Sequence, residues 1–96
     1  MTYVIVARWQ ARDGEREKIE SILHDLVQEC RKEPGVRQFV AHRSLERPAE
    51  FLLYEQYESE QAFLDHQQTA HFKTLVLEQA VPRLAHRERL PFSILD

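Results

Sequence analysis

The stretch from Tyr3 to Trp9 constrains the fold most, because it is typical of a β-strand that is apolar on both faces. It is rich in β-branched and aromatic residues, and the turn signal Asp13-Gly14 ends it. Side chains alternate along a strand, so one face carries Tyr3, Ile5, Ala7 and Trp9, and the other carries Val4, Val6, Arg8 and Gln10. A sheet that contains such a strand must be covered on both faces.

The next segments predict a helix and two strands. Apolar residues at i, i+3, i+4, i+7, i+8 and i+11 predict an amphipathic helix over residues 15–32, which Pro34-Gly35 ends. Alternation predicts strands over residues 36–43 and 51–58. The turn between them lies at residues 46–50, which contain a proline.

The last part of the chain predicts a broken helical region followed by a strand. Ser59 is a candidate N-cap for a short helix, and Thr69 is a candidate N-cap for a second helix that Pro82 interrupts. A charged stretch follows at residues 86–89. The short apolar tail over residues 91–95 predicts a fourth strand.

These segments follow the order βαββαβ, which predicts an α+β, ferredoxin-like fold: an antiparallel four-stranded sheet with helices on one face. A length of 96 residues predicts a single domain, residues 1–96. The helices can cover only one side of the sheet, yet the first strand is apolar on both. We therefore expect a homodimer that packs sheet to sheet.

Charge and composition exclude several classes of partner. The formal net charge of -3 gives no basic surface for nucleic acid. No apolar stretch approaches the ~20 residues that span a bilayer. The single cysteine, Cys30, cannot form an internal disulfide, and it falls on the apolar face of the first helix. We therefore expect a buried thiol in a reducing compartment. We expect a cytoplasmic protein without nucleic-acid or membrane partners.

Glu55 is the most informative polar residue, because it lies between Leu53 and Tyr57 on a strand face that is otherwise buried. A lone buried charge is costly, so this carboxylate must be paired, hydrogen-bonded or protonated. Its expected partner is His66, which lies three residues after Phe63 on one side of the following helix. Two interpretations stay open: an acid–base pair in a pocket, or a structural carboxylate paired with an Arg or His.

A third candidate catalytic residue, His71, follows the Thr69 cap. It could line the mouth of a pocket or form hydrogen bonds across the helix break. Flat apolar side chains suit a planar aromatic ligand, although most of them also suit the core. The candidate substrate-binding walls are Trp9, Phe39, Tyr57, Phe63 and Phe72.

Neither a metal nor another cofactor is expected. His66 and His71 are five residues apart, which does not place two ligands on one side of a continuous helix, and Cys30 is far from both in the sequence. A three-ligand site that adds Glu55 is conceivable but has no support. With only 2 glycines, the chain has no phosphate-binding loop. The remaining histidines show no ligand spacing and are expected to be solvated: His24, His42 and His86.

Three segments resemble one known family when they are taken together: VARWQARDG, EPGVRQF and FLLYEQYESEQAFLDHQQTAHFKTL. They are similar to the antibiotic biosynthesis monooxygenase family of small dimeric α+β barrel proteins, which includes quinol monooxygenases. The resemblance runs from about Val4 to Leu77. It implies a dimer and a pocket between the helices and the sheet within each subunit.

The haem-degrading branch of the same superfamily is similar in fold but relies on an Asn, a Trp and a His ligand. The matching positions here hold Ala7, Tyr57 and Val76. A valine cannot ligate iron, and an alanine cannot hydrogen-bond a bound oxygen. The sequence therefore disfavours haem oxygenation.

The resemblance and the candidate residues together predict a monooxygenase that works without metal or flavin on a small aromatic, quinol-type substrate and molecular oxygen. Glu55 or His66 would act as the base, and His71 would orient a substrate oxygen. One alternative is a dimeric binding or stress-related protein without turnover. Another is an isomerase of the same fold that acts on a sugar-like phosphate, which would need a cationic anchor.

Overall fold

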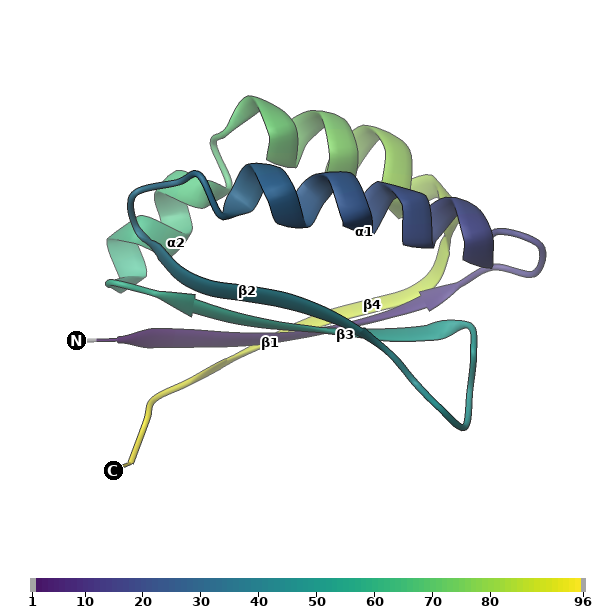
Figure 1. Ribbon diagram of the computed structural model, residues 1–96, viewed down its shortest axis with the longest axis horizontal. Coiled ribbons are helices and arrows are strands. Elements are labelled where there is room, and N and C mark those ends of the chain that lie inside the picture. The colour runs from purple at the N-terminus through teal and green to yellow at the C-terminus, as the bar shows by residue number, and fades with distance from the viewer. Residues whose placement is uncertain (1, 96) are drawn as a thin grey trace.

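The computed structural model describes residues 2–95 and places all helical segments on one face of an antiparallel sheet (Figure 1). The sheet has four strands in the order β2-β3-β1-β4, namely β1 (Tyr3–Ala11), β2 (Val36–Arg43), β3 (Glu50–Tyr57) and β4 (Leu84–Phe92). The helical segments are α1 (Arg16–Cys30), α2 (Glu60–His66), the π-helix η1 (Phe72–Ala80) and the 3₁₀ helix η2 (Val81–Arg83). The predicted α+β, ferredoxin-like order βαββαβ is confirmed. None of the described helices is long and apolar enough to cross a membrane.

Helix α1 carries the largest share of the helical side of the core. Its buried face consists of Ile19, Ile22, Leu23, Leu26 and Cys30. These side chains join one cluster with strand residues that include Trp9, Phe39, Phe51 and Leu53. Burying an aliphatic side chain contributes roughly 1.5–3 kcal/mol, so several such contacts hold the helix firmly on the sheet. The end of α1, where Cys30 lies, is therefore fixed above the sheet.

The second helical region is broken, as the two cap candidates predict. The Ser59 side chain accepts a hydrogen bond from the Ala62 amide at 3.1 Å and begins α2. The Thr69 hydroxyl accepts from the Phe72 amide at 3.2 Å and donates to the His66 carbonyl at 2.8 Å. One side chain thus ties the end of α2 to the start of η1. The two histidines that flank this break, at positions 66 and 71, are held close together by it.

The predicted fourth strand is present, but its predicted bounds, residues 91–95, are wrong. Strand β4 begins at Leu84, so the charged residues 86–89 lie inside it and residues 93–95 follow it. It is an edge strand, where charged side chains and a proline are tolerated because one side makes no ladder hydrogen bonds. Arg87 lies opposite Trp9, and Arg89 lies opposite Ala7. Directly opposed residues share a face, so both arginines lie on the helix-covered side.

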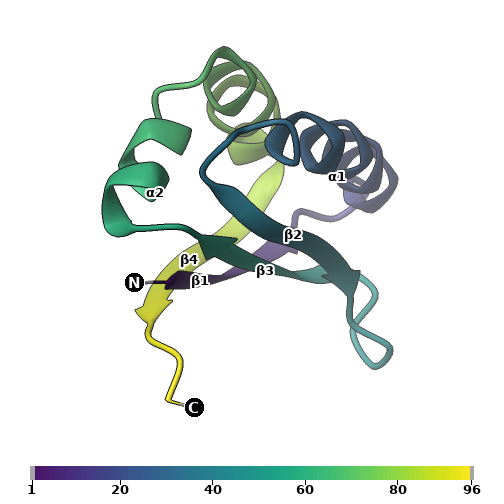
Figure 2. The same ribbon diagram turned by 60° about the vertical axis from the view of Figure 1, so that its left-hand side comes forward.

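Within residues 2–95, no helix lies over the other face of the sheet (Figure 2). An apolar row crosses its four strands, in which Leu90, Val6, Tyr54 and Val40 are successive cross-strand partners. Leu90 is 46% exposed in the single chain. On the same face Arg8 lies 3.6 Å from Glu88 and 4.0 Å from Glu50. The chain by itself therefore leaves a continuous apolar strip, flanked by ion pairs, open to solvent.

Candidate active site

Glu55 is buried in the middle of β3, between Ile5 of β1 and Phe39 of β2, and is only 4% exposed. The Tyr57 hydroxyl donates a hydrogen bond of 2.6 Å to Glu55 Oε1. Burial raises the pKa of Glu55 to about 7, although the Tyr57 hydrogen bond and the nearby arginine charges of β4 oppose the rise. Burial and the adjacent carboxylate raise the pKa of Tyr57, so its hydroxyl stays protonated and donates. Glu55 therefore changes protonation near neutral pH.

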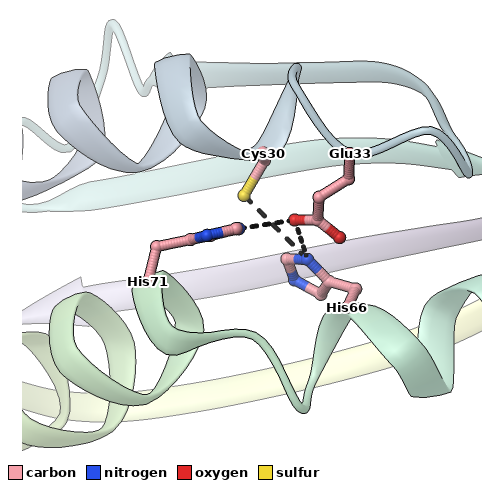
Figure 3. A group of neighbouring side chains, drawn as sticks. All are labelled: Cys30, Glu33, His66 and His71. Carbon is pink, nitrogen blue, oxygen red and sulfur yellow. Dashed lines mark hydrogen bonds and ion pairs between the residues drawn. The ribbon is translucent and has the colours of Figure 1, made fainter.

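The predicted pairing of Glu55 with His66 is wrong. His66 Nδ1 instead lies 2.9 Å from Glu33 Oε2, and His71 Nε2 lies 2.6 Å from the same oxygen (Figure 3). Burial acts to raise the pKa of Glu33, but the hydrogen bonds from the two histidines outweigh it and hold that pKa below its usual value. An ionised carboxylate thus links the two histidines. Of the two interpretations of His71, a hydrogen-bonded link across the helix break fits, and a place in the cavity wall does not.

Cys30 belongs to the same group of side chains. Its Sγ lies 4.0 Å from His66 Nδ1, and one ligand atom from each of Cys30, Glu33, His66 and His71 lies within 4.8 Å of all the others. Burial, and then the charge of Glu33, raise the pKa of the Cys30 thiol, which is therefore protonated. The expectation that Cys30 lies too far from the histidines is wrong. Cys30 and His66 are far apart along the chain but are neighbours in the folded structure.

Local structure explains how these four residues meet. Helix α1 ends at Cys30, and the following turn places Glu33 opposite the end of α2. The turn approaches α2 closely at Gly35, where a Cβ atom would lie 2.6 Å from the Ala62 Cβ. Only a glycine fits without displacing one of the two segments. Gly35 thus does more than end the first helix, because it lets the Glu33 turn dock against α2.

A small cavity separates the sheet from the helices and contains both candidate catalytic groups. Its volume is about 20 Å³, enough for roughly one water molecule. Glu55 and His66 line it together with four of the five predicted aromatic walls, Trp9, Phe39, Phe63 and Phe72. Tyr57 is outside the lining, fully buried behind Glu55, and His71 is also outside it. A cavity therefore lies between the sheet and the helices as expected, but it has room for only about one water molecule, and its polar groups are Glu55, His66 and two arginines.

Those arginines, Arg87 and Arg89, are residues that the sequence analysis missed. Both line the buried cavity and also an outer hollow of about 370 Å³ between α2, η1 and β4. Phe72 is shared by the two spaces as well, so these three side chains form the wall between them. Among the described residues, the buried Nε of Arg87 has no hydrogen-bond partner. The Arg89 guanidinium lies 5.7 Å from the centroid of the Phe63 ring. Alternation through residues 84–92 would have signalled that both arginines face inward.

A larger hollow of about 390 Å³ lies elsewhere, between α1 and β2. Its lining includes His24 and His42, which are exposed as the sequence analysis expects. No buried polar or charged side chain lines it. Volume alone would favour this hollow, but catalytic groups need a site from which water is excluded, and only the smaller cavity offers that.

Comparison with known proteins bears on the family and the fold of this chain. A family model for antibiotic biosynthesis monooxygenases matches residues 2–76. Among solved structures, Rv0793 from Mycobacterium tuberculosis superposes with a TM-score of 0.92 at 23% identity, over 100% of this chain and 97% of that chain. PA3566 from Pseudomonas aeruginosa gives a TM-score of 0.90 at 26% identity, over 99% and 95% of the two chains. An antibiotic biosynthesis monooxygenase structure gives 0.91 at 18% identity over 100% of both chains. No curated protein matches the sequence. The match of the family model over most of the chain, together with the shared fold, shows that this chain belongs to the antibiotic biosynthesis monooxygenase family.

Proposed function

We propose that the protein is a monooxygenase that acts without metal or flavin and hydroxylates a small quinol-type aromatic substrate with molecular oxygen. The observation that carries the proposal is the placement of His66 and Glu55 in the wall of one aromatic-lined cavity, each held by its own hydrogen-bond partner. Family membership supports a monooxygenase-like fold. The substrate class is inferred from the aromatic walls and polar groups of the cavity. The cavity of about 20 Å³ is smaller than a quinol, so substrate binding requires Phe72, Arg87 and Arg89 to move and join it to the outer hollow of about 370 Å³.

The first requirement is a substrate that can reduce oxygen. Ground-state oxygen is a triplet and reacts slowly with closed-shell organic molecules, so without a cofactor the substrate must supply the electron. A quinol becomes a strong one-electron donor once a base removes its proton. Removal of water from the site strengthens every electrostatic contact that holds the resulting anion.

His66 is the proposed base. The ionised Glu33 accepts the Nδ1 proton of His66, which leaves Nε2 without a proton and able to take one from a phenol. His66 is 3% exposed, and its ring packs edge-on against Phe72 with the centroids 5.1 Å apart. The imidazole is thus fixed in both position and tautomer.

Glu55 is the proposed acid. Tyr57 donates to one carboxyl oxygen, which leaves the other oxygen free to carry a proton. A pKa of about 7 means that this proton is present in a large fraction of molecules at neutral pH. The guanidinium groups of Arg87 and Arg89, which line the same cavity, would stabilise the substrate anion.

The proposed reaction uses both side chains. His66 Nε2 takes a quinol proton, the anion passes one electron to oxygen, and the radical pair forms a carbon–oxygen bond to give a peroxide anion. Glu55 protonates the outer oxygen of this peroxide. The carbon that bears the peroxide then loses its hydrogen as a proton to the Glu55 carboxylate, and the C–H electron pair forms the new C=O bond as the O–O bond breaks. The leaving hydroxide takes the proton held by His66 and departs as water. One quinol and one oxygen molecule thus give one hydroxyquinone and one water.

The experiment is oxygen uptake with a panel of hydroquinones, measured above the background without enzyme. His66→Gln and Glu55→Gln should each lower the rate by about 10²–10⁴, the usual contribution of a positioned acid or base. The control His86→Gln changes an exposed histidine of β4 and should keep the wild-type rate. Turnover that both site variants retain would refute the assignment, and ligand binding without any turnover would favour the non-catalytic alternative.

The two arginines also favour a second candidate, an isomerase that acts on a sugar-like phosphate. Such a substrate needs a cationic anchor, and Arg87 and Arg89 provide one beside Glu55 and His66. The two functions differ in oxygen demand. Product formation from a phosphorylated sugar under argon, at the same rate as in air, would support the isomerase and contradict the oxygenase.

We also propose that the protein works as a homodimer that packs sheet to sheet. The support is the apolar row of Leu90, Val6, Tyr54 and Val40 on the face without helices. Packing this row against a second copy of the chain would remove it from water. It would also cover the second apolar face of β1.

Sedimentation velocity tests this dimer. Leu90→Asp places a charge in the apolar row and should give monomers, whereas the wild type should sediment with twice the mass. The matched control is Leu64→Asp, because Leu64 is 45% exposed but lies on α2, on the helical side. A wild-type monomer at all concentrations, or a dimer that Leu64→Asp breaks and Leu90→Asp spares, would contradict this interface.

A further inference from the structure

The side chains of Cys30, Glu33, His66 and His71 form a compact group whose chemistry goes beyond acid–base work (Figure 3). They offer one sulfur, two imidazole nitrogens and one carboxylate oxygen. Such a mixed set is what zinc and similar divalent transition metals bind, usually with four ligands in a tetrahedron. We propose that this group is a binding site for a divalent metal ion of the zinc class, and that the bound metal turns the proposed oxygenase off.

The spacing of the ligand atoms supports the site. Bonds of about 2.0–2.3 Å in a tetrahedron place neighbouring ligand atoms about 3.3–3.7 Å apart. Here His66 Nδ1 and His71 Nε2 lie 2.9 and 2.6 Å from Glu33 Oε2, and Cys30 Sγ lies 4.0 Å from His66 Nδ1. All four atoms lie within 4.8 Å of one another. Shifts of about 1 Å or less would therefore admit an ion between them.

The charge of the group also favours a cation. It holds an ionised carboxylate in a largely buried place, with the side chains of Glu33 and His71 only 12% and 18% exposed. Binding a divalent ion moves the Cys30 thiol proton to solvent. Each neutral imidazole keeps its proton on the ring nitrogen that faces away from the metal. The filled group then has no net charge, which removes the cost of a buried anion.

The group lies on segments that the fold holds together. Cys30 ends α1, and Glu33 lies in the turn that Gly35 docks against α2. His66 ends α2, and His71 begins the helical turn before η1. Four protein ligands leave no open position for substrate, which is the arrangement of structural or regulatory zinc and not of catalytic zinc. The partly exposed His71 and Glu33 side chains give the ion its way in.

The regulatory effect rests on the proposed function and follows from the tautomer of His66. Without metal, Glu33 holds the proton on Nδ1, and Nε2 is free to accept a proton. A metal on Nδ1 forces the proton of the neutral ring onto Nε2, so the ring can no longer act as a base. Metal binding would thus remove the proposed base through His66, which belongs both to the metal-binding group and to the cavity lining.

Cobalt is the probe for the site itself, because tetrahedral Co²⁺ absorbs strongly in the visible and a thiolate adds a charge-transfer band in the near ultraviolet. The protein should be tag-free, reduced and treated with chelator. We expect one Co²⁺ per chain with both signatures, and displacement by one Zn²⁺. Cys30→Ser should lose the charge-transfer band, and His71→Ala should lose the tetrahedral spectrum. The matched control His86→Ala, an exposed histidine outside the group, should keep both.

The outcomes separate the site from the function. A cobalt spectrum that lacks the thiolate band, or one that persists in Cys30→Ser and His71→Ala, would overturn the metal site. The spectrum does not depend on turnover, so failure of the oxygenase assay leaves this test intact. If cobalt binds as expected and the oxygenase is active, one equivalent of Zn²⁺ should abolish oxygen uptake. Full activity with zinc bound would overturn the inhibitory role.

Discussion

The strongest test of the site is the replacement of Glu55 by glutamine, because the structure predicts its effect on stability without reference to any substrate. Burial raises the pKa of Glu55 from 4.5 to about 7 in the folded chain. At about 1.4 kcal/mol per pKa unit, the folded state loses about 3 kcal/mol when this group ionises. Because the folded pKa is the higher one, the stability that Glu55 contributes is fully present below pH 4.5 and is lost as the pH rises through 7.

Urea unfolding at a series of pH values, at fixed protein concentration, measures this loss. The glutamine in Glu55→Gln cannot ionise. The free energy of unfolding of the variant minus that of the wild type should therefore increase by about 3 kcal/mol from pH 4.5 to pH 7.5. The control Glu46→Gln removes an exposed loop carboxylate and should leave the wild-type profile unchanged in shape. A difference between wild type and Glu55→Gln that is flat with pH, or that changes in the opposite direction, would refute the reasoning about burial.

Three further predictions concern the neighbours of Glu55 and His66. Tyr57→Phe removes a hydrogen bond worth about 1.5–3 kcal/mol to the ionised Glu55, so the alkaline limb of the pH–rate profile should move up by about 1–2 pH units; a limb that stays in place would contradict Glu55 as the acid. Glu33→Gln breaks a charged hydrogen-bond network and should lower the free energy of unfolding in urea by about 2–4 kcal/mol. A higher pH should not restore this stability, because the glutamine cannot ionise. Gly35→Ala should cost about 1–3 kcal/mol in thermal unfolding, and adding Ala62→Gly should restore part of it, because the clash joins those two Cβ atoms; additive effects would show that the segments do not touch.

The topology could be predicted from the sequence because its signals are local. Alternation in residues 3–9, 36–43 and 51–58, and the cap residues Ser59 and Thr69, each act within a few residues of the structure they specify. The exception is β4. Its residues 86–89 are charged and hide the alternation of inward-facing and outward-facing side chains, so the strand is predicted too late in the chain. An edge strand tolerates such charges, and two of them face a cavity, so an apolar pattern was the wrong signal there.

The site could be predicted only in part, and the reason lies in distance along the chain. Glu55 and four aromatic walls were found because burial follows from the strand and helix patterns. The partner of His66 was not found, because Glu33 looks like one more charge in a turn. Its position beside the helix break depends on the tertiary contact of Gly35 with Ala62, which no local pattern records. Spacing rules for metal ligands failed for the same reason, since they assume a single continuous element.

The linker of residues 67–71 is bounded by two imidazoles that bond to the same carboxylate oxygen. This segment is therefore anchored at both ends to a turn that precedes a different strand. An outward movement of the whole linker would break both contacts or carry the Glu33 turn with it. Such a movement would couple access to the cavity to the orientation of His66.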